Sequence, residues 1–265
     1  MSTRDPMGTA YDMTGPKGAP VVVLVHGLGL SRAIWQWLVP LLASRFRVVS
    51  YDLIGHGRTV VPVGKPVLRD LAHQLEILID HLGVAKAAIV GFSLGGMVAR
   101  RFSQDCPDRV TALAILHSPH RRTQAQQAAI VARVEQTKNV GPAATVEAAL
   151  VRWYTDNARA SRAELMEQTR AWVLANDPKI YPELYLILAT GIEEIVTPVP
   201  PIACPTLVLT ADEDYGNGPE MSAAIAAEIS GAELLILKGL RHMALAENPD
   251  AVNGPVLAFL TKVLG

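Results

Sequence analysis

The chain is poor in the features that mark secreted and membrane proteins. Its 265 residues include only two cysteines, Cys106 and Cys204, which lie far apart and without the spacing of zinc ligands. We therefore expect neither a disulfide framework nor a metal site. No apolar run approaches the roughly 18 residues of a membrane span, and the start lacks the apolar core of a signal peptide. We expect a cytoplasmic protein with no membrane partner.

The chain also lacks an excess of charge of either sign. It has 24 basic and 25 acidic residues, a formal net charge of −1, and neither sign forms a long block. A protein that binds nucleic acid or an anionic membrane normally carries a basic patch or stripe. We therefore predict no nucleic-acid partner, and the sequence carries no signal for an oligomeric state.

What the chain does contain is a regular alternation of apolar runs with amphipathic ones. Six runs read as strands, at residues 21–25, 47–51, 87–90, 110–116, 206–210 and 233–237. Helix-like runs lie between and after them, at residues 31–43, 67–82, 94–104, 219–229 and 249–264. Strands without polar alternation are typical of a parallel sheet that is covered on both faces. We predict an α/β fold, a doubly wound and mostly parallel sheet.

The alternation of strand and helix stops between residues 120 and 202. This segment has no strand-like run and reads as helices at residues 125–137, 143–154, 161–175 and 181–188. We predict that residues 120–202 form a helical cap, or lid, inserted into an α/β core made of residues 1–119 and 203–265. Such a cap would lie over the edge of the sheet where the strands end.

The stretch around Ser93 has the pattern of a nucleophile elbow. An apolar run at residues 87–90 enters a Gly-x-Ser-x-Gly turn, in which Gly91 and Gly95 flank Ser93, and the turn opens directly into a helix-like run. A Cβ at either glycine would collide with the neighbouring strand or helix. The motif alone arises by chance in about one chain of this length in ten, so other residues must support it.

Two later loops supply the partners that a serine nucleophile needs. A histidine must accept the serine proton, and a buried carboxylate must orient that histidine. His242 follows the last expected strand, and an acidic cluster follows the strand at residues 206–210. We predict the catalytic residues Ser93, Asp214 and His242. Asp214 is preferred because it lies deeper in its loop, and Asp212 is the alternative.

The first buried strand ends in His26-Gly27-Leu28-Gly29, a glycine-rich turn at the same edge of the sheet. Ligands bind at this edge in open α/β sheets. We predict that the backbone N–H groups of Leu28 and Leu94 form an oxyanion hole. His26 is expected at the substrate site, as a residue that orients by hydrogen bonding and not as a base. For Asp52 and His56, roles in stabilising a turn are favoured over catalytic ones.

Nearly the whole chain resembles capped proteins of the α/β-hydrolase fold. The matching landmarks are Val25-His26-Gly27-Leu28-Gly29, Asp52-Leu53-Ile54-Gly55-His56-Gly57, Gly91-Phe92-Ser93-Leu94-Gly95-Gly96 and Arg241-His242-Met243. Within that superfamily, Gly95-Gly96-Met97 and Arg152-Trp153-Tyr154-Thr155 resemble 3-oxoadipate enol-lactonases. The chain departs from those lactonases in its His26-Gly27 pair, which general esterases and ring-cleavage-product hydrolases keep.

The resemblance implies a hydrolase that cleaves a small ester or lactone through an acyl-enzyme and needs no cofactor. It also implies that Trp153 forms part of the pocket wall, with Tyr154 nearby, and that Arg152 or Arg159 meets a substrate carboxylate. Three alternatives stay open: a hydrolase of C–C bonds, a cofactor-free lyase, and a ligand receptor that scarcely turns over.

Overall fold

The structure is a computed structural model that describes residues 3–265, so the first two residues of the expected core segment 1–119 lie outside the described residues. Eight strands form one sheet, in the order β1-β2-β4-β3-β5-β6-β7-β8. The strands are β1 (Thr3–Arg4), β2 (Ala10–Thr14), β3 (Val21–Val25), β4 (Arg47–Tyr51), β5 (Ala87–Phe92), β6 (Val110–Leu116), β7 (Thr206–Ala211) and β8 (Glu233–Leu237). The strands β1 and β2 pair antiparallel, and β3 to β8 run parallel. The α/β class and the mostly parallel sheet are confirmed.

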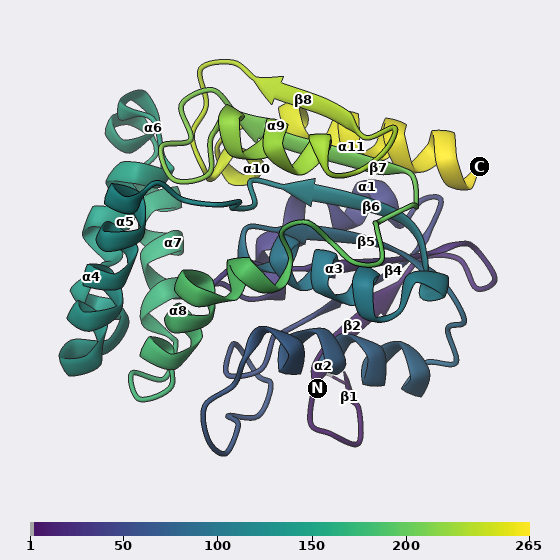
Figure 1. The fold of residues 1–265 in the computed structure, drawn as a ribbon, viewed down its shortest axis with the longest axis horizontal. Helices are drawn as coiled ribbons and strands as arrows, with labels where there is room; N and C mark the ends of the chain where they lie inside the picture. Colours follow the sequence, from purple (N-terminus) through teal and green to yellow (C-terminus); the bar gives the residue numbers. More distant parts are fainter. Residues whose placement is uncertain (1–2) are drawn as a thin grey trace.

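Helices cover both faces of the sheet, as a parallel sheet requires (Figure 1). The first face carries α2 (Leu68–His81), α3 (Leu94–Asp105) and α9 (Pro219–Ala227). The second carries η1 (Arg32–Trp37), α1 (Val39–Leu42), α10 (Ala244–Glu247) and α11 (Pro249–Leu264). Alternate side chains of each central strand enter the two cores. Val23 and Val25 of β3 face the first core, whereas Val22 and Leu24 face the second.

The segment between β6 and β7 is helical and lies beyond the carboxyl ends of the parallel strands, at the left of Figure 1. Its helices are α4 (Gln124–Val140), η3 (Gly141–Ala144), α5 (Val146–Trp153), α6 (Asp156–Ser161), α7 (Ala163–Leu174), α8 (Tyr181–Thr190) and η4 (Gly191–Glu194). A short turn, η2 (Pro107–Arg109), precedes β6. The cap helices therefore stand over the edge of the sheet where Ser93 lies.

Several expected helices are divided in the structure. The run at residues 31–43 breaks at Leu38 into η1 and α1, because Pro40 has no N–H to continue the helical hydrogen bonds. The run at residues 161–175 begins only at Ala163, since Arg162 has φ −123° and ψ 60° and separates α6 from α7. The antiparallel strands β1 and β2 were not expected, because neither is a continuous apolar run.

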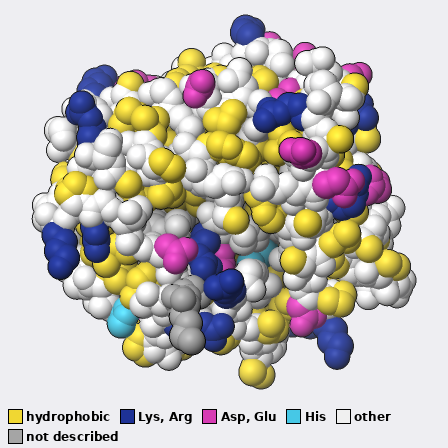
Figure 2. Space-filling view, turned by 180° about the vertical axis from the view of Figure 1, so that it is seen from behind, with side chains coloured by type: hydrophobic (Ala, Val, Ile, Leu, Met, Phe, Trp, Pro, Cys, Tyr) yellow, Lys and Arg dark blue, Asp and Glu magenta, His cyan; other side chains and the backbone are white. Residues whose placement is uncertain are grey.

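Polar and apolar side chains are mixed on the surface. On the face drawn in Figure 2, basic and acidic side chains lie interspersed among apolar ones, in keeping with a net charge of −1. Among residues 3–265, no helix is long and apolar enough to cross a membrane.

Candidate active site

Ser93 sits on a strained turn between β5 and α3. Its backbone has φ 54° and ψ −114°, a conformation that side-chain-bearing residues rarely adopt. The flanking glycines make this turn possible. A Cβ on Gly91 would lie 2.3 Å from the carbonyl oxygen of Gly95, and a Cβ on Gly95 would lie 2.0 Å from that of Val25. Ser93 is thus held at the start of a helix, where its side chain lines a cleft.

His242 and Asp214 meet beside this turn, although 28 residues separate them in the chain. Asp214 lies in the loop after β7, and His242 lies in the loop between β8 and α10. The Nδ1 atom of His242 is 2.8 Å from Oδ2 of Asp214. Because an ionised carboxylate only accepts hydrogen bonds, Nδ1–H of His242 donates, and its Nε2 is left able to accept a proton.

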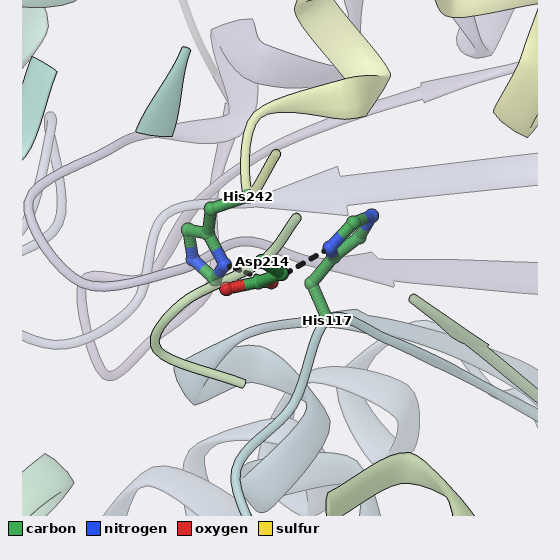
Figure 3. A group of neighbouring side chains, drawn as sticks. All are labelled: His117, Asp214 and His242. Atoms are coloured by element: carbon green, nitrogen blue, oxygen red, sulfur yellow. Dashed lines mark hydrogen bonds and ion pairs between the residues drawn. The ribbon is translucent and has the colours of Figure 1, made fainter. Parts of the chain in front are cut away.

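A third residue, His117, completes this cluster (Figure 3). It directly follows β6 with φ 49° and is fully buried. Its Nδ1 lies 2.9 Å from the same Oδ2 of Asp214, so the carboxylate lies between two imidazoles. The other oxygen of Asp214 accepts the N–H groups of Gly216 at 3.1 Å and Asn217 at 3.0 Å. Each oxygen of the carboxylate therefore accepts two hydrogen bonds.

These contacts decide the charge of Asp214. Burial favours its neutral form, but the charge of His242 and the hydrogen bonds from His117 and His242 more than offset burial and hold the pKa of Asp214 below its ordinary value. For His117, burial is the dominant effect: it lowers the pKa, although the hydrogen bond to Asp214 opposes the change. The cluster is thus a carboxylate that accepts from a neutral His117 and orients His242.

The same three residues have the ligand types of a metal site, with one ligand atom from each lying within 4.8 Å of the others. However, both Nδ1 atoms that approach Asp214 are used as donors to its carboxylate. Hydrogen bonds to Asp214 therefore account for the positions of both Nδ1 atoms, whereas Nε2 of His117 is buried without a partner among residues 3–265.

Asp212, the alternative carboxylate, contacts Gly239 and Lys238 and not His242. Its Oδ1 accepts the N–H of Gly239 at 2.8 Å, and its Oδ2 lies 3.5 Å from Nζ of Lys238. These contacts tie together the two loops that follow β7 and β8. The histidine contact is made by Asp214.

Aromatic rings confine the imidazole of His242 from two sides. The Phe92 ring centroid lies 5.0 Å from that of His242, and the Trp153 centroid lies 6.0 Å away on the cap side. Within the described part of the chain, no hydrogen bond joins the Ser93 hydroxyl to His242, although both side chains line one cleft. Catalytic contacts of this kind often tighten only when substrate binds.

The expected oxyanion donors lie on either side of Ser93. Leu28 follows β3 and lines the cleft, and Leu94 is the first residue of α3. The first N–H groups of a helix have no acceptor within it, so the N–H of Leu94 is not used by α3. For the N–H of Leu28, the structure of residues 3–265 assigns no acceptor.

His26 does not reach the cleft, so the expectation that it contacts substrate is corrected. Its side chain is fully buried and lies behind the Gly27–Gly29 turn. Its Nε2 accepts the N–H of Leu53 at 2.9 Å, and its Nδ1 therefore donates to the carbonyl of Gly27 at 2.8 Å. Burial lowers the pKa of His26 to about 4 and keeps the ring neutral. These two hydrogen bonds support the other part of the prediction, that His26 orients neighbouring groups by hydrogen bonding.

His56 braces the same turn from the next loop. Its Nε2 accepts the N–H of Gly29 at 3.1 Å, and its Nδ1 donates to the carbonyl of Ile54 at 3.0 Å. Burial lowers its pKa to about 3. Asp52 likewise accepts the N–H groups of Arg32 at 2.8 Å and Arg58 at 2.9 Å. Both residues therefore stabilise turns.

The cleft between the sheet edge and the cap, hereafter the cap cleft, holds the remaining expected residues. Its lining comes from both parts of the chain and includes Gly27, Leu28, Leu30, Ser93, Arg122, Arg133, Arg152, Trp153, Tyr181, Tyr185, His242 and Met243. Trp153 and Arg152, two of the residues expected to bind substrate, line this cleft. Tyr154 does not: it is fully buried, and its hydroxyl pairs with that of Thr169 at 2.7 Å. Arg159 is paired with Asp156 at 2.7 Å and is not among the lining residues.

Most of the chain matches a known protein family. The model of the alpha/beta hydrolase family matches residues 22–254. The chain belongs to the alpha/beta hydrolase family.

Relatives of this alpha/beta hydrolase include two enzymes of Acinetobacter baylyi. The chain is 26% identical to an (E)-2-((N-methylformamido)methylene)succinate hydrolase, over 95% of this chain and 94% of that protein. It is 23% identical to 3-oxoadipate enol-lactonase 2, over 95% and 92% of the two chains. Among solved structures, the enol-lactonase from Burkholderia xenovorans LB400 superposes with a TM-score of 0.89 at 26% identity, over 96% of each chain.

Three polar residues near Ser93 were missed in the sequence: His117, which donates to Asp214, and Arg122 and Arg133, which line the cap cleft. His117 carried a usable signal, because it directly follows a buried strand and so lies on the same sheet edge as Ser93. For Arg122 and Arg133 the sequence signal was weak. No acidic residue stands four positions from either, so neither has an obvious ion-pair partner at helical spacing. Their approach to the cleft depends on how the cap helices pack.

Proposed function

We propose that this alpha/beta hydrolase cleaves a small carboxylated ester or lactone through an acyl-enzyme formed on Ser93. One observation carries the proposal: Ser93, on its strained turn, shares a cleft with a histidine whose Nδ1 is held at 2.8 Å by a buried, ionised Asp214. This combination of nucleophile, base and orienting carboxylate is the one that acyl transfer requires.

In the proposed reaction, the Ser93 hydroxyl attacks the acyl carbon while Nε2 of His242 takes its proton. The N–H groups of Leu28 and Leu94 hold the oxyanion of the tetrahedral intermediate. His242 then gives the proton to the leaving oxygen, and the acyl-enzyme remains. A water molecule, deprotonated by the same nitrogen, attacks the acyl carbon and releases the acid and Ser93. Asp214 stays ionised and stabilises the imidazolium at both stages.

The carboxylated substrate is proposed from the wall of the cap cleft. Trp153 stands 6.0 Å from the His242 ring, and the neighbouring Arg152 also lines the cleft. The guanidinium of Arg152 donates to the carbonyl of Ala148 at 2.9 Å, and no carboxylate of residues 3–265 pairs with it. A substrate carboxylate beside the reacting bond would supply that missing partner. The names of the two Acinetobacter relatives, an enol-lactonase of an oxoadipate and a hydrolase of a substituted succinate, support this choice.

Ester turnover tests the proposal. With p-nitrophenyl acetate, the wild-type protein should give an initial burst followed by steady release of nitrophenol, and Ser93→Ala should give neither. Stoichiometric labelling of Ser93 without turnover would instead indicate a receptor. Hydrolysis that persists in Ser93→Ala would exclude the acyl-enzyme on this residue.

A further inference from the structure

The cap cleft contains more positive charge than a single substrate carboxylate needs. Besides Arg152 on α5, it is lined by Arg122, just before α4, and by Arg133 within α4. Among residues 3–265, none of the three guanidinium groups has a carboxylate oxygen within 4.0 Å, whereas three other arginines of the cap, Arg121, Arg159 and Arg170, do. Asp214, the acidic residue of the lining, is already held by two histidines.

Arg122 is the clearest case of an unused donor. Its Nη2 donates to the carbonyl of Leu188 at 3.0 Å, which fixes the group against α8. Its Nη1 is buried and has no hydrogen-bond partner in the described part of the chain. A buried, unpaired donor on a charged group costs more than an ordinary lost hydrogen bond, so an acceptor from outside the protein would be well placed there.

Arg133 is positioned by Tyr185. Its Nε donates to the Tyr185 hydroxyl at 3.0 Å, which orients the guanidinium and leaves its two Nη groups without a recorded partner among residues 3–265. The Tyr185 hydroxyl accepts in this contact and keeps its own hydrogen to donate. Both residues line the cap cleft, so both present donors to the same space.

The arginines also repel one another. Burial, reinforced by the charge of Arg133, lowers the pKa of Arg122 to about 10. Burial likewise lowers the pKa of Arg152, and Arg133 again contributes. Three cations therefore converge in one partly enclosed site, where their repulsion is weakly screened. A protein tolerates such a cluster when an anion occupies it in the working complex.

We propose that Arg122 and Arg133 form a second carboxylate subsite, so that the substrate is a small dicarboxylate whose acyl group reacts at Ser93. This inference rests on the proposed function for the reacting end of the molecule. One substrate carboxylate pairs with Arg152, and the other pairs with Nη1 of Arg122 and the Nη groups of Arg133. Two carboxylates and the oxyanion of the intermediate together match the three positive charges.

Binding to a protein that cannot turn over tests the subsite separately from catalysis. The Ser93→Ala protein is titrated by calorimetry with succinate, glutarate and adipate, and with the monomethyl ester of each. At least one diacid should bind at least tenfold more tightly than its monomethyl ester, and the preference should weaken as salt is raised. Equal affinity for diacid and monoester would overturn the subsite, as would inorganic phosphate binding as tightly as the best diacid.

Arginine variants locate the second carboxylate. In the Ser93→Ala background, Arg122→Gln and Arg133→Gln should each abolish the preference for diacid over monoester. Arg159→Gln, a cap arginine that does not line the cleft, is the matched control and should keep it. Thermal unfolding of each variant shows whether it folds, and removal of a repelling charge is expected to leave Tm unchanged or raise it. Undiminished preference in both variants would overturn the assignment.

The two proposals fail in different ways. If no diacid binds selectively but wild type hydrolyses p-nitrophenyl acetate through Ser93, the dicarboxylate inference is wrong and the hydrolase mechanism stands. If diacids bind selectively but no ester or lactone is turned over, the subsite stands and the proposed reaction is wrong.

Discussion

His117 and His242 donate hydrogen bonds to the same oxygen of Asp214, at 2.9 and 2.8 Å. The two histidines come from different loops of the sheet edge, and the carboxylate of Asp214 lies between their rings (Figure 3). Only His242 also lines the cap cleft. In the proposed mechanism, His117 is therefore a positioning residue that acts through Asp214.

Replacement of His117 should slow turnover by loosening Asp214. A hydrogen bond to a charged group contributes about 1.5–3 kcal/mol, so we expect His117→Ala to lower kcat by about tenfold or more. His117→Gln, which can still donate to Asp214, should recover part of the loss. Steady-state kinetics of the two variants check this, and equal kcat values for wild type and His117→Ala would contradict the positioning role.

Ser93 and His242 should behave as one catalytic unit. We expect Ser93→Ala and His242→Ala each to reduce kcat/KM on the order of 10⁴-fold or more, because neither residue works without the other. The double variant should be little worse than either single one. Losses that multiply in the double variant would show that the two residues act independently.

Asp214 and Asp212 should differ sharply in their effect on turnover. Asp214→Asn removes the carboxylate that orients His242, and the expected loss in kcat is on the order of 10⁴-fold. Asp212→Asn disturbs only contacts with Gly239 and Lys238, so kcat should change by less than about tenfold. A larger loss for Asp212→Asn than for Asp214→Asn would reverse the assignment.

Trp153 and Arg152 should set selectivity toward the substrate. On a lactone that bears a carboxylate, compared with the methyl ester of that lactone, Arg152→Gln should lose the preference for the free acid. Trp153→Ala should raise KM for both compounds, because the aromatic wall beside His242 is removed. The matched control is Arg159→Gln, whose partner is Asp156. Wild-type selectivity in Arg152→Gln together with a wild-type KM in Trp153→Ala would move the specificity determinants to the loops around Leu30, Ile54 and Met243.

Acid should destabilise the protein through His26 and His56, the two buried histidines that contact the Gly27–Gly29 turn. Burial lowers the pKa of His26 to about 4 and that of His56 to about 3, whereas an unfolded histidine titrates near ~6.5. The unfolded chain therefore binds more protons below pH ~6.5, and stability falls as pH decreases from there to about 4. Each histidine contributes on the order of 3 kcal/mol to this loss.

Urea unfolding at several pH values tests that expectation. The free energy of unfolding of His56→Gln should depend less steeply on pH between 6.5 and 4 than that of wild type. Identical slopes for wild type and His56→Gln would show that His56 is not kept neutral by burial.

Local sequence determined most of the α/β core. Strands 21–25, 47–51, 110–116 and 233–237 coincide with the structure. The first three are buried along most of their length, as expected in a sheet that is covered on both faces, whereas β8 at the edge of the sheet is only partly buried. Gly91 and Gly95 likewise fixed the turn at Ser93, since a Cβ has no room at either position. Chain order alone then placed a serine, an acidic loop and a histidine on one edge of the sheet.

Only the tertiary structure decided which side chains meet at that edge. Asp212 and Asp214 are two residues apart in one loop, and the path of the loop turns the second toward His242. His26 precedes the Gly27–Gly29 turn, yet its side chain is fully buried and accepts the N–H of Leu53. The approach of Arg122 and Arg133 depends on how α4 packs against α8, a long-range contact that no local pattern encodes.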